Sequence, residues 1–342
     1  MKISLGCCYW RPIILIVAVL AIGFGFWQKL FLVPGVAVES RRNLTQSDIN
    51  QWMKELSNWG RWGKTDELGA LNFITAEKRK NAAKLVKEGI SVSLARDVEK
   101  QESIDNPYPF KHTMLLTGES PGMFSNDKFA VQYHGWAHTH MDSLCHMFFE
   151  GKMFNGFSQL EVSNSGTGKL GIQQFKKGIF TRGILIDIPR LKGVNYLEPK
   201  QAIYPEDLDA WEKKAGIKVS RGDVIFVRTG RWARRKEKGV WDITKEAAGM
   251  YASCAQWLHQ REISMLGSDA ASEVAPSGIE GVISPIHQLS IIAMGVPLFD
   301  NCDLEAVSAE ANRLGRWDFL LTTAPLPVNG GTGSPLNPIA TF

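Results

Sequence analysis

Four of the seven histidines of this 342-residue chain lie in one short segment, residues 134–146, which reads HGWAHTHMDSLCH. The titratable residues of this segment are His134, His138, His140, Asp142 and His146. Histidine is the commonest side-chain ligand of metal ions, and a carboxylate often completes the site. In a β-strand, alternate residues share a face, so His138, His140 and Asp142 would present an N, N, O ligand set suited to zinc or manganese.

Two other interpretations of the segment are open. If the segment is helical, His134, His138 and Asp142 would stack at steps of four residues; the aromatic and small residues before Thr139 favour the strand. A polar strand face whose histidines bond only to the backbone would need no metal. The density of histidine and aspartate favours a metal site over a polar strand face without metal.

A cysteine-dependent enzyme is a third possibility, because Cys145 lies inside the segment and could act as a thiol nucleophile with His146 or His287. The neighbouring histidines and aspartate already account for the segment as metal chemistry. The five cysteines show no C-x-x-C pair and no spacing typical of a disulfide framework.

The N-terminus carries an uncharged apolar run at residues 12–27, between Arg11 and Lys29. This run is long for a signal peptide and slightly short for a spanning helix. We predict a single-pass membrane anchor over residues 1–37, with a cleaved signal segment and a secreted protein as the alternative. A linker and leading helix would follow at residues 38–57, and one large domain at residues 58–342.

The remainder of the chain predicts an α/β fold with a mixed sheet. Two nearly continuous apolar runs, residues 183–188 and 222–229, are typical of strands covered on both faces. The other predicted strands are residues 90–94, 110–122, 129–139, 263–266 and 319–326. The predicted helices are residues 48–59, 75–88, 205–215, 247–260 and 286–294.

Composition excludes a nucleic-acid-binding protein, since the net charge of +4 is small and dispersed. The densest basic run, residues 231–238 (RWARRKEK), is interpreted as a solvated surface segment, with a phosphate-binding patch as the alternative.

The segment Thr139-His140-x-Asp142-x-x-x-His146 resembles the motif His-x-Gly-Thr-His-x-Asp-x-Pro-x-His of the cyclase-like metal-dependent hydrolases, which include bacterial kynurenine formamidase and isatin hydrolase. The resemblance to this family covers the chain from residue 59 to the C-terminus. The further blocks that resemble this family, in the same order, are Arg61-Trp62-Gly63, Asp66-Glu67-Leu68-Gly69, Gly222-Asp223-Val224, Arg228-Thr229-Gly230, Gly267-Ser268-Asp269, His287 with Gly295-x-Pro297, and Gly331-Thr332-Gly333-Ser334-Pro335.

This resemblance implies a swivelling β/α/β-type cyclase-like fold, one or two divalent cations, and a homo-oligomer. It also implies hydrolysis of an amide, formamide or cyclic amide bond in a small-molecule substrate. Position by position, His140 and Asp142 match metal ligands, and His146 and His287 match acid–base residues or ligands of a second ion. Asp300 falls near a position where the family has a glutamate ligand.

The chain departs from the family motif at Trp136, which occupies the place of the first histidine ligand. An indole cannot ligate zinc or manganese, so His138 or His134 would have to substitute from the same strand face. The spacing predicts His138. The resemblance favours His140, Asp142 and His146, and implies that His134 is a structural or outer residue. Because Trp136 would face the substrate, we expect a substrate preference different from that of the named relatives.

Ser268 and Asp269 are predicted to hydrogen-bond ligand histidines, which need a partner on the second ring nitrogen. Asp269 could equally be a turn or helix-cap residue. The glycine-rich residues 331–333 could approach the site closely or form a structural loop. The predicted function is a hydrolase that activates water at the metal, and the alternative is a membrane-tethered metal- or ligand-binding protein without turnover.

Overall fold

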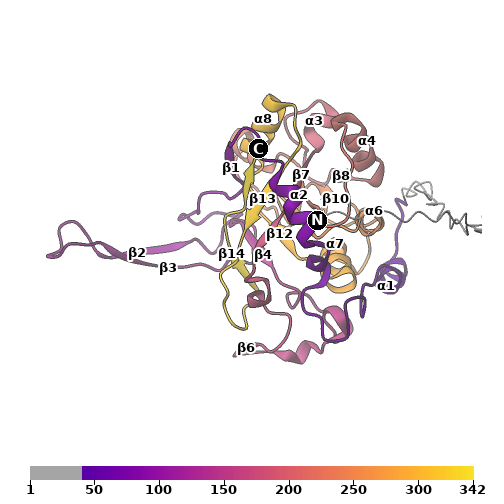
Figure 1. Cartoon of the computed structure of the whole chain (residues 1–342), viewed down its shortest axis with the longest axis horizontal. Coiled ribbons are helices and arrows are strands. Elements are labelled where there is room, and N and C mark those ends of the chain that lie inside the picture. Colours follow the sequence, from indigo (N-terminus) through magenta and orange to yellow (C-terminus); the bar gives the residue numbers. More distant parts are fainter. Residues whose placement is uncertain (1–40) are drawn as a thin grey trace, which may run out of the picture. The chain divides into compact units, whose positions relative to one another are not determined.

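The computed structural model describes residues 41–342, which belong to one compact unit. Within the described residues, nine strands form one mixed sheet, and helices α2, α4 and α8 pack against strand β7 (Figure 1). The mixed α/β class predicted from the sequence is therefore confirmed. The predicted N-terminal helix lies outside the described residues, and the predicted domain boundaries stay a prediction.

The strands of the main sheet are, in spatial order, β1 (Ser91–Ser93), β15 (Ile339–Thr341), β13 (Asp318–Thr323), β7 (Ile179–Asp187), β9 (Val224–Arg228), β11 (Met265–Ser268), β12 (Leu298–Asp300), β4 (His140–Asp142) and β14 (Gly333–Pro335). Three strand pairs lie apart from it: β2 (Lys111–Leu116) with β3 (Asn126–Ala130), β5 (Val162–Ser163) with β6 (Gly166–Thr167), and β8 (Ala202–Ile203) with β10 (Gly249–Met250).

The helices are α1 (Gln46–Glu55), α2 (Ala76–Ala83), α3 (Ile188–Lys192), α4 (Pro205–Ala215), α5 (Arg231–Lys238), α6 (Cys254–Arg261), α7 (Pro285–His287) and α8 (Glu305–Leu314). A π-helix, η5 (Gln288–Met294), continues α7, and short 3-10 helices are η1 (Gly69–Phe73), η2 (Phe154–Gly156), η3 (Gln159–Glu161) and η4 (Ile172–Phe175).

Parallel strands form the centre of the main sheet, and antiparallel strands form its two sides. Strands β7, β9, β11 and β12 are parallel to one another, whereas β4 runs antiparallel to both β12 and β14. All five residues of β9 are buried, as are the last five of β7. This burial confirms the two strands predicted from apolar runs, because a strand covered on both faces has no polar side to alternate with.

Local signals predicted some of the helices, whereas α3, α5 and α8 were not predicted. Helix α4 has the predicted bounds, since Pro205 suits a first turn and Gly216 ends the helix in the left-handed conformation. Helix α1 begins earlier than predicted, because Thr45 caps it through a reciprocal capping box with Asp48. Part of the helix predicted at residues 247–260 is strand instead, where β10 pairs with β8.

The strand predicted at residues 129–139 is wrong over most of its length. Strand β3 ends at Ala130, and residues 134–138 form bends that lead into the three-residue strand β4. The side-chain amide of Asn301 donates to the carbonyls of Gly135 and His138, at 2.7 and 3.3 Å. These two carbonyls therefore bond to a side chain and not to a neighbouring strand. The segment is not extended, so its side chains do not alternate between two faces.

The prediction of a membrane-anchored chain is corrected here. Among residues 41–342, no helix combines the length and apolar character needed to cross a bilayer. The segment that carried the prediction, residues 1–37, lies outside the described residues, as does the alternative signal segment.

The basic run at residues 231–238 forms helix α5, and its cations are largely paired. The guanidinium of Arg231 is buried, Arg234 contacts Glu198 at 2.8 Å, and Arg235 contacts Asp105 at 2.7 Å. These contacts explain the cations of the run without a phosphate ligand. The run is also less solvated than predicted, because Arg231 is buried.

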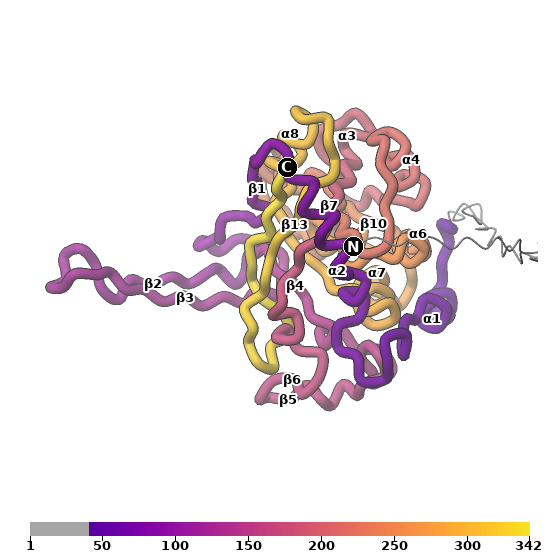
Figure 2. The backbone as a smooth tube through the Cα atoms, in the orientation of Figure 1, coloured from indigo at the N-terminus to yellow at the C-terminus, as the bar shows by residue number. Residues whose placement is uncertain are grey.

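Strands β2 and β3 form a hairpin that projects from the body of the unit, as the ribbon and tube views show (Figures 1 and 2). Ten of its eleven strand residues are exposed. We refer to residues 111–130 as the hairpin arm.

Candidate metal centre

The centre is built on strand β4. Side chains alternate between the two faces of this strand, so the candidate ligands lie on one face and a core residue on the other. His140 and Asp142 point to one face, whereas the side chain of Met141 points to the other face and is fully buried in the core. In the register with β12, Asp300 lies directly opposite His140. Opposed residues of an antiparallel pair share a face, so the fold brings Asp300 to His140 and Asp142.

Strand β14 lies on the other edge of β4 and closes one side of the centre. Gly333 is opposite Asp142, and a Cβ at Gly333 would lie 2.5 Å from the carbonyl oxygen of Met141 and 2.9 Å from Cε1 of His134. Only glycine leaves room there for the His134 ring. The close approach predicted as one possibility for residues 331–333 is thus present.

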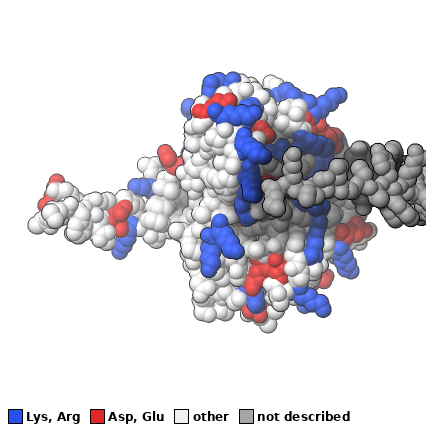
Figure 3. All heavy atoms as spheres, in the orientation of Figure 1, with Lys and Arg blue, Asp and Glu red and all other residues white. Residues whose placement is uncertain are grey.

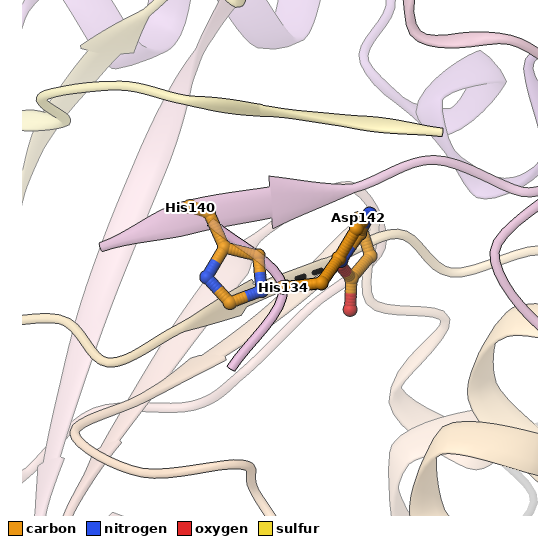
Figure 4. Close-up of side chains that lie close together, drawn as sticks. All are labelled: His134, His140 and Asp142. Carbon is orange, nitrogen blue, oxygen red and sulfur yellow. Dashed lines mark ion pairs between the residues drawn. The ribbon is translucent and has the colours of Figure 1, made fainter. Parts of the chain in front are cut away.

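Asp142 is the central group, and its side chain is 1% exposed. Its Oδ1 lies 3.0 Å from Nδ1 of His134 and 3.4 Å from Nε2 of His140, which Figure 4 shows converging on the carboxylate. Its Oδ2 lies 3.7 Å from Nε2 of His287 and 4.0 Å from Nε2 of His146. Four histidine rings therefore surround one buried carboxylate.

Hydrogen bonds to the second ring nitrogen orient two of these histidines. The Nδ1 of His140 donates to the backbone carbonyl of His138 at 2.9 Å. A carbonyl only accepts, so the neutral His140 ring has its proton on Nδ1, and the lone pair of Nε2 faces Asp142. The Nε2 of His134 contacts the hydroxyl of Thr332 at 3.0 Å, which leaves Nδ1 toward Asp142. This is the orientation that ligand histidines have in metal sites.

A second group lies beside the first and shares Asp142 with it. Nε2 of His287 is 3.2 Å from Oδ2 of Asp300, and Nδ1 of His287 is 2.8 Å from Oε2 of Glu273. The ligand atoms of His134, His140 and Asp142 lie within 4.8 Å of one another, and so do those of Asp142, His287 and Asp300. The arrangement could hold two cations with Asp142 between them.

The electrostatics follow from burial and from these neighbours. Burial alone would raise the pKa of Asp142, but His146, His134 and His140 hold it well below its usual value, so the carboxylate is charged. Burial lowers the pKa of His146 to about 4, despite the attraction of Asp142. Burial opposes protonation of His287 too, yet Glu273 and Asp300 raise its pKa well above the usual value.

The donor set fits a divalent cation because several buried polar atoms have no hydrogen bond. Within the described part of the chain, both carboxylate oxygens of Asp142, one oxygen of Asp300 and Nδ1 of His134 are buried without such a partner. An unpaired buried polar atom is costly, and a buried carboxylate more so. Imidazole nitrogens and carboxylate oxygens are ligands for zinc and manganese, so a cation at this position would satisfy the atoms that the protein leaves unpaired.

The structure places the predicted ligand His138 and the predicted substrate contact Trp136 outside both ligand groups. The His138 ring packs edge-on against Phe110, and its Nε2 lies 3.5 Å from the carbonyl of Tyr108. His134, not His138, joins His140 and Asp142. The indole of Trp136 packs partly buried against a small apolar cluster that includes Ile243.

Ser268 and Asp269 do not contact the ligand histidines. The hydroxyl of Ser268 accepts from the backbone N–H of Ser272 at 2.8 Å, and so fixes the loop that carries Glu273. Asp269 accepts from the backbone N–H groups of Thr229 and Gly230, at 3.0 and 2.8 Å, ahead of α5. Asp269 therefore binds backbone amides that precede α5, whose N-cap residue is Gly230, and it makes no contact with a ligand histidine.

Cys145 is a poor nucleophile in this structure. Its thiol is buried, and burial raises its pKa above the usual value, which disfavours the reactive thiolate. Burial of the thiol therefore speaks against the cysteine-dependent alternative.

Glu273 is the residue of the centre that sequence reasoning missed. It lies in an irregular segment, far from the histidine cluster along the chain, and no local pattern distinguishes it. The neighbouring Ser272 has a positive φ of 61°, and the Ala275–Pro276 peptide is cis. The contact with His287 exists only because the loop after β11 folds back over that histidine.

Comparisons with known proteins agree with this architecture. The Cyclase family model matches residues 89–273. A solved structure described as a novel cyclase is 30% identical, with a TM-score of 0.75, and the match covers 84% of this chain and 98% of that one. None of the curated proteins matches the chain.

Isatin hydrolases share the fold at lower identity. Isatin hydrolase A from Ralstonia solanacearum is 18% identical, with a TM-score of 0.55, and the match covers 73% of this chain and 91% of that one. Isatin hydrolase A from Labrenzia aggregata is 17% identical, with a TM-score of 0.55 and coverage of 76% and 96%. The family model spans more than half of this chain, and the cyclase structure matches most of it, so the chain belongs to the Cyclase family.

Proposed function

We propose that the chain is a metal-dependent hydrolase that cleaves an amide, formamide or cyclic amide bond. The observation that carries the proposal is the buried Asp142 carboxylate, which four histidine nitrogens approach within 3.0–4.0 Å and whose oxygens have no hydrogen-bond partner among residues 41–342. A purely structural carboxylate in this position would be expected to accept hydrogen bonds.

His134, His140 and Asp142 would hold one cation, and Asp142, His287 and Asp300 a second. When bound, a divalent cation supplies Lewis acidity, which lowers the pKa of a water molecule and polarises a carbonyl. Zinc and manganese both suit these ligands. Protons compete for the same nitrogens, so we expect metal affinity to fall as the pH drops.

His146 is the residue placed to move a proton. Its side chain is 26% exposed, and its ring stacks on His134 with a centroid separation of 4.0 Å. Because burial lowers its pKa to about 4, His146 is neutral at pH 7 and has a free lone pair. It can accept a proton from a nucleophilic water and return it to the leaving nitrogen, a role worth about 10²- to 10⁴-fold in rate.

His287 is more enclosed, and Glu273 and Asp300 hold its two nitrogens. It would ligate the second cation, or keep a proton at Nε2 when only one ion is bound. Trp136 and the half-buried Trp241 pack on one small apolar cluster that also contains Ala270. We propose that Trp136, whose indole is only partly buried, contacts an aromatic or cyclic substrate.

The test is to assay the full-length protein after chelation and after restoring zinc or manganese. The panel would contain aryl formamides, isatin, cyclic imides and lactones, and bound metal would be quantified by elemental analysis. We expect activity to vanish on chelation and return with the metal. His140→Ala and Asp142→Ala should abolish both bound metal and activity, whereas His259→Ala, in α6 and outside the centre, should change neither.

Hydrolysis that survives chelation, or that persists in both ligand variants, would contradict the proposal. Stoichiometric metal without turnover across the panel would support the metal-binding protein instead. Inhibition by thiol alkylation with indifference to chelators would support a cysteine-dependent enzyme.

A further inference from the structure

Asn301 turns the chain directly after Asp300, at the end of strand β12. It is fully buried and has a positive φ of 54°, a conformation that asparagine tolerates better than most residues. Its backbone N–H donates to the carbonyl of Ala270 at 2.9 Å, and its own carbonyl accepts from the hydroxyl of Thr139 at 2.7 Å. The turn directs the Asn301 side chain toward the bend formed by residues 134–138.

The side chains of Asn301 and Arg231 together bind three backbone carbonyls of this bend. The amide of Asn301 donates to the carbonyls of Gly135 and His138, at 2.7 and 3.3 Å. The guanidinium of Arg231 donates to the carbonyl of Trp136 and, at 2.6 Å, to Oδ1 of Asn301. No residue of the bend lies in a strand, so these side-chain bonds fix its course.

The same bonds lead to both histidines of the group formed by His134, His140 and Asp142. The carbonyl of His138 also accepts from Nδ1 of His140, the bond that turns Nε2 of His140 toward Asp142. His134 begins the bend, and its Nδ1 lies 3.0 Å from Oδ1 of Asp142. Asn301 therefore holds the carbonyl that orients one ligand histidine and the carbonyl of the residue that follows the other.

Arg231 is an unusual residue for a purely structural position. Figure 3 shows lysine and arginine side chains at the surface of the body, whereas the side chain of Arg231 is 2% exposed. Its one ion pair within residues 41–342, with Asp105, is long at 4.0 Å, and its Nε has no hydrogen-bond partner there. A buried cation with so little compensation is costly, and an apolar side chain of similar volume often stabilises a fold as well or better. The contacts of Arg231 with Trp136 and Asn301 explain the arginine better than stability does.

We propose that Asn301 and Arg231 are positioning residues, which hold His134 and His140 against Asp142 and so determine the metal affinity of that group. Neither residue would touch the cation, since each acts through the backbone of the bend. The inference rests on the proposed metal-dependent function, but the positions of the two histidine rings can be tested without a metal.

The first test uses Asn301→Asp in the full-length protein, because aspartate has nearly the same shape and tolerates the same backbone conformation. Its carboxylate can accept from Arg231 and pair with it, but it cannot donate to the two carbonyls. We expect the metal-free variant to unfold at a denaturant concentration at or above that of the wild type, because the buried cation gains a partner. Its zinc affinity should nonetheless fall by about 10- to 100-fold, although the added negative charge alone would attract the cation.

The matched control is Asn58→Asp, which should bind zinc as the wild type does. Asn58 is also buried and belongs to neither ligand group. It donates to the carbonyl of Met294 at 2.9 Å and accepts from Arg61 at 3.0 Å, so the same change removes a comparable amide donor. Arg231→Met should also lose zinc affinity, by about 10-fold or more, whereas Arg261→Met, in α6, should not.

Two spectra report the histidine rings directly. Imidazole ¹⁵N spectra of the metal-free protein at alkaline pH should show His140 with its proton on Nδ1 in the wild type and in Asn58→Asp, and a mixture of tautomers in Asn301→Asp. With cobalt in place of zinc, the visible absorption bands should shift in Asn301→Asp alone of these three proteins.

Zinc affinity or imidazole signals unchanged in Asn301→Asp would overturn the inference. An equal loss of affinity in Asn58→Asp, or a loss in Asn301→Asp matched by a loss of metal-free stability, would overturn it too. A wild type that binds neither zinc nor cobalt would refute the proposed function instead, and the imidazole spectra would still decide whether Asn301 positions the rings.

Discussion

The sharpest prediction concerns the histidine that accompanies His140 and Asp142. Spacing along a strand favoured His138, whereas the structure places Nδ1 of His134 3.0 Å from Oδ1 of Asp142. The ring of His138 faces Phe110 instead. Replacing each histidine by alanine tests which one is the ligand. Strand alternation predicts that the His138 variant loses metal affinity, whereas the structure predicts this loss for the His134 variant.

The magnitude follows from the role of each ring. Loss of a residue that only orients a ligand lowers metal affinity by about 10- to 100-fold. Loss of a ligand itself should cost more, so His134→Ala is expected to weaken metal binding by at least about 100-fold. His138→Ala removes no ligand atom, and we expect the affinity to stay within about threefold of the wild type.

The assay is a competition titration of the metal-free protein with zinc and a chromophoric chelator at pH 7.5. Thermal unfolding of each metal-free variant serves as the control for folding. The reasoning is refuted if the two variants lose affinity equally, or if His134→Ala binds zinc as the wild type does.

Three further predictions concern the surroundings of the centre. Glu273→Ala should lower zinc affinity by about 10- to 100-fold in the same titration, because it removes the partner of His287, and Glu273→Gln should lose less, since its amide oxygen still accepts. Gly333→Ala should destabilise the fold by about 1–3 kcal/mol in denaturant unfolding, because its Cβ would lie 2.5 Å from a backbone oxygen of β4, whereas Gly135→Ala meets no atom within 4 Å and should be neutral. Burial holds the pKa of His146 at about 4 in the folded state, below its ordinary 6.5, so its contribution to stability is full above pH 6.5 and is lost as the pH falls toward 4. The metal-free protein should lose about 3 kcal/mol across that window relative to His146→Asn, and parallel pH profiles of the two proteins would contradict the assignment.

Much of the fold is encoded locally and could be predicted. The apolar runs that became β7 and β9, and the Pro205 start and Gly216 end of α4, are signals contained within a few residues. Bounds that depend on tertiary pairing could not be predicted in this way. Strand β10 replaced part of a predicted helix because it pairs with β8, which lies far away in the sequence.

The residues of the metal centre also differ in whether local sequence could predict them. His140 and Asp142 lie two residues apart on one short strand, so spacing alone placed them together. His134 reaches them through a bend held by the side chain of Asn301, which no pattern within residues 134–146 reveals. Glu273 reaches His287 through a loop whose course depends on the whole sheet. Spacing predicts ligands within one element, and the assembled fold decides the others.

The most direct test of the central claim is anomalous X-ray scattering from crystals of the zinc-loaded full-length protein, recorded on both sides of the zinc absorption edge. The account predicts a peak about 2.1 Å from an oxygen of Asp142, with His134 and His140 as further ligands. A second peak beside His287 and Asp300 would show that both groups are filled. Zinc bound away from Asp142, or a fully folded protein that takes up no zinc, would contradict it.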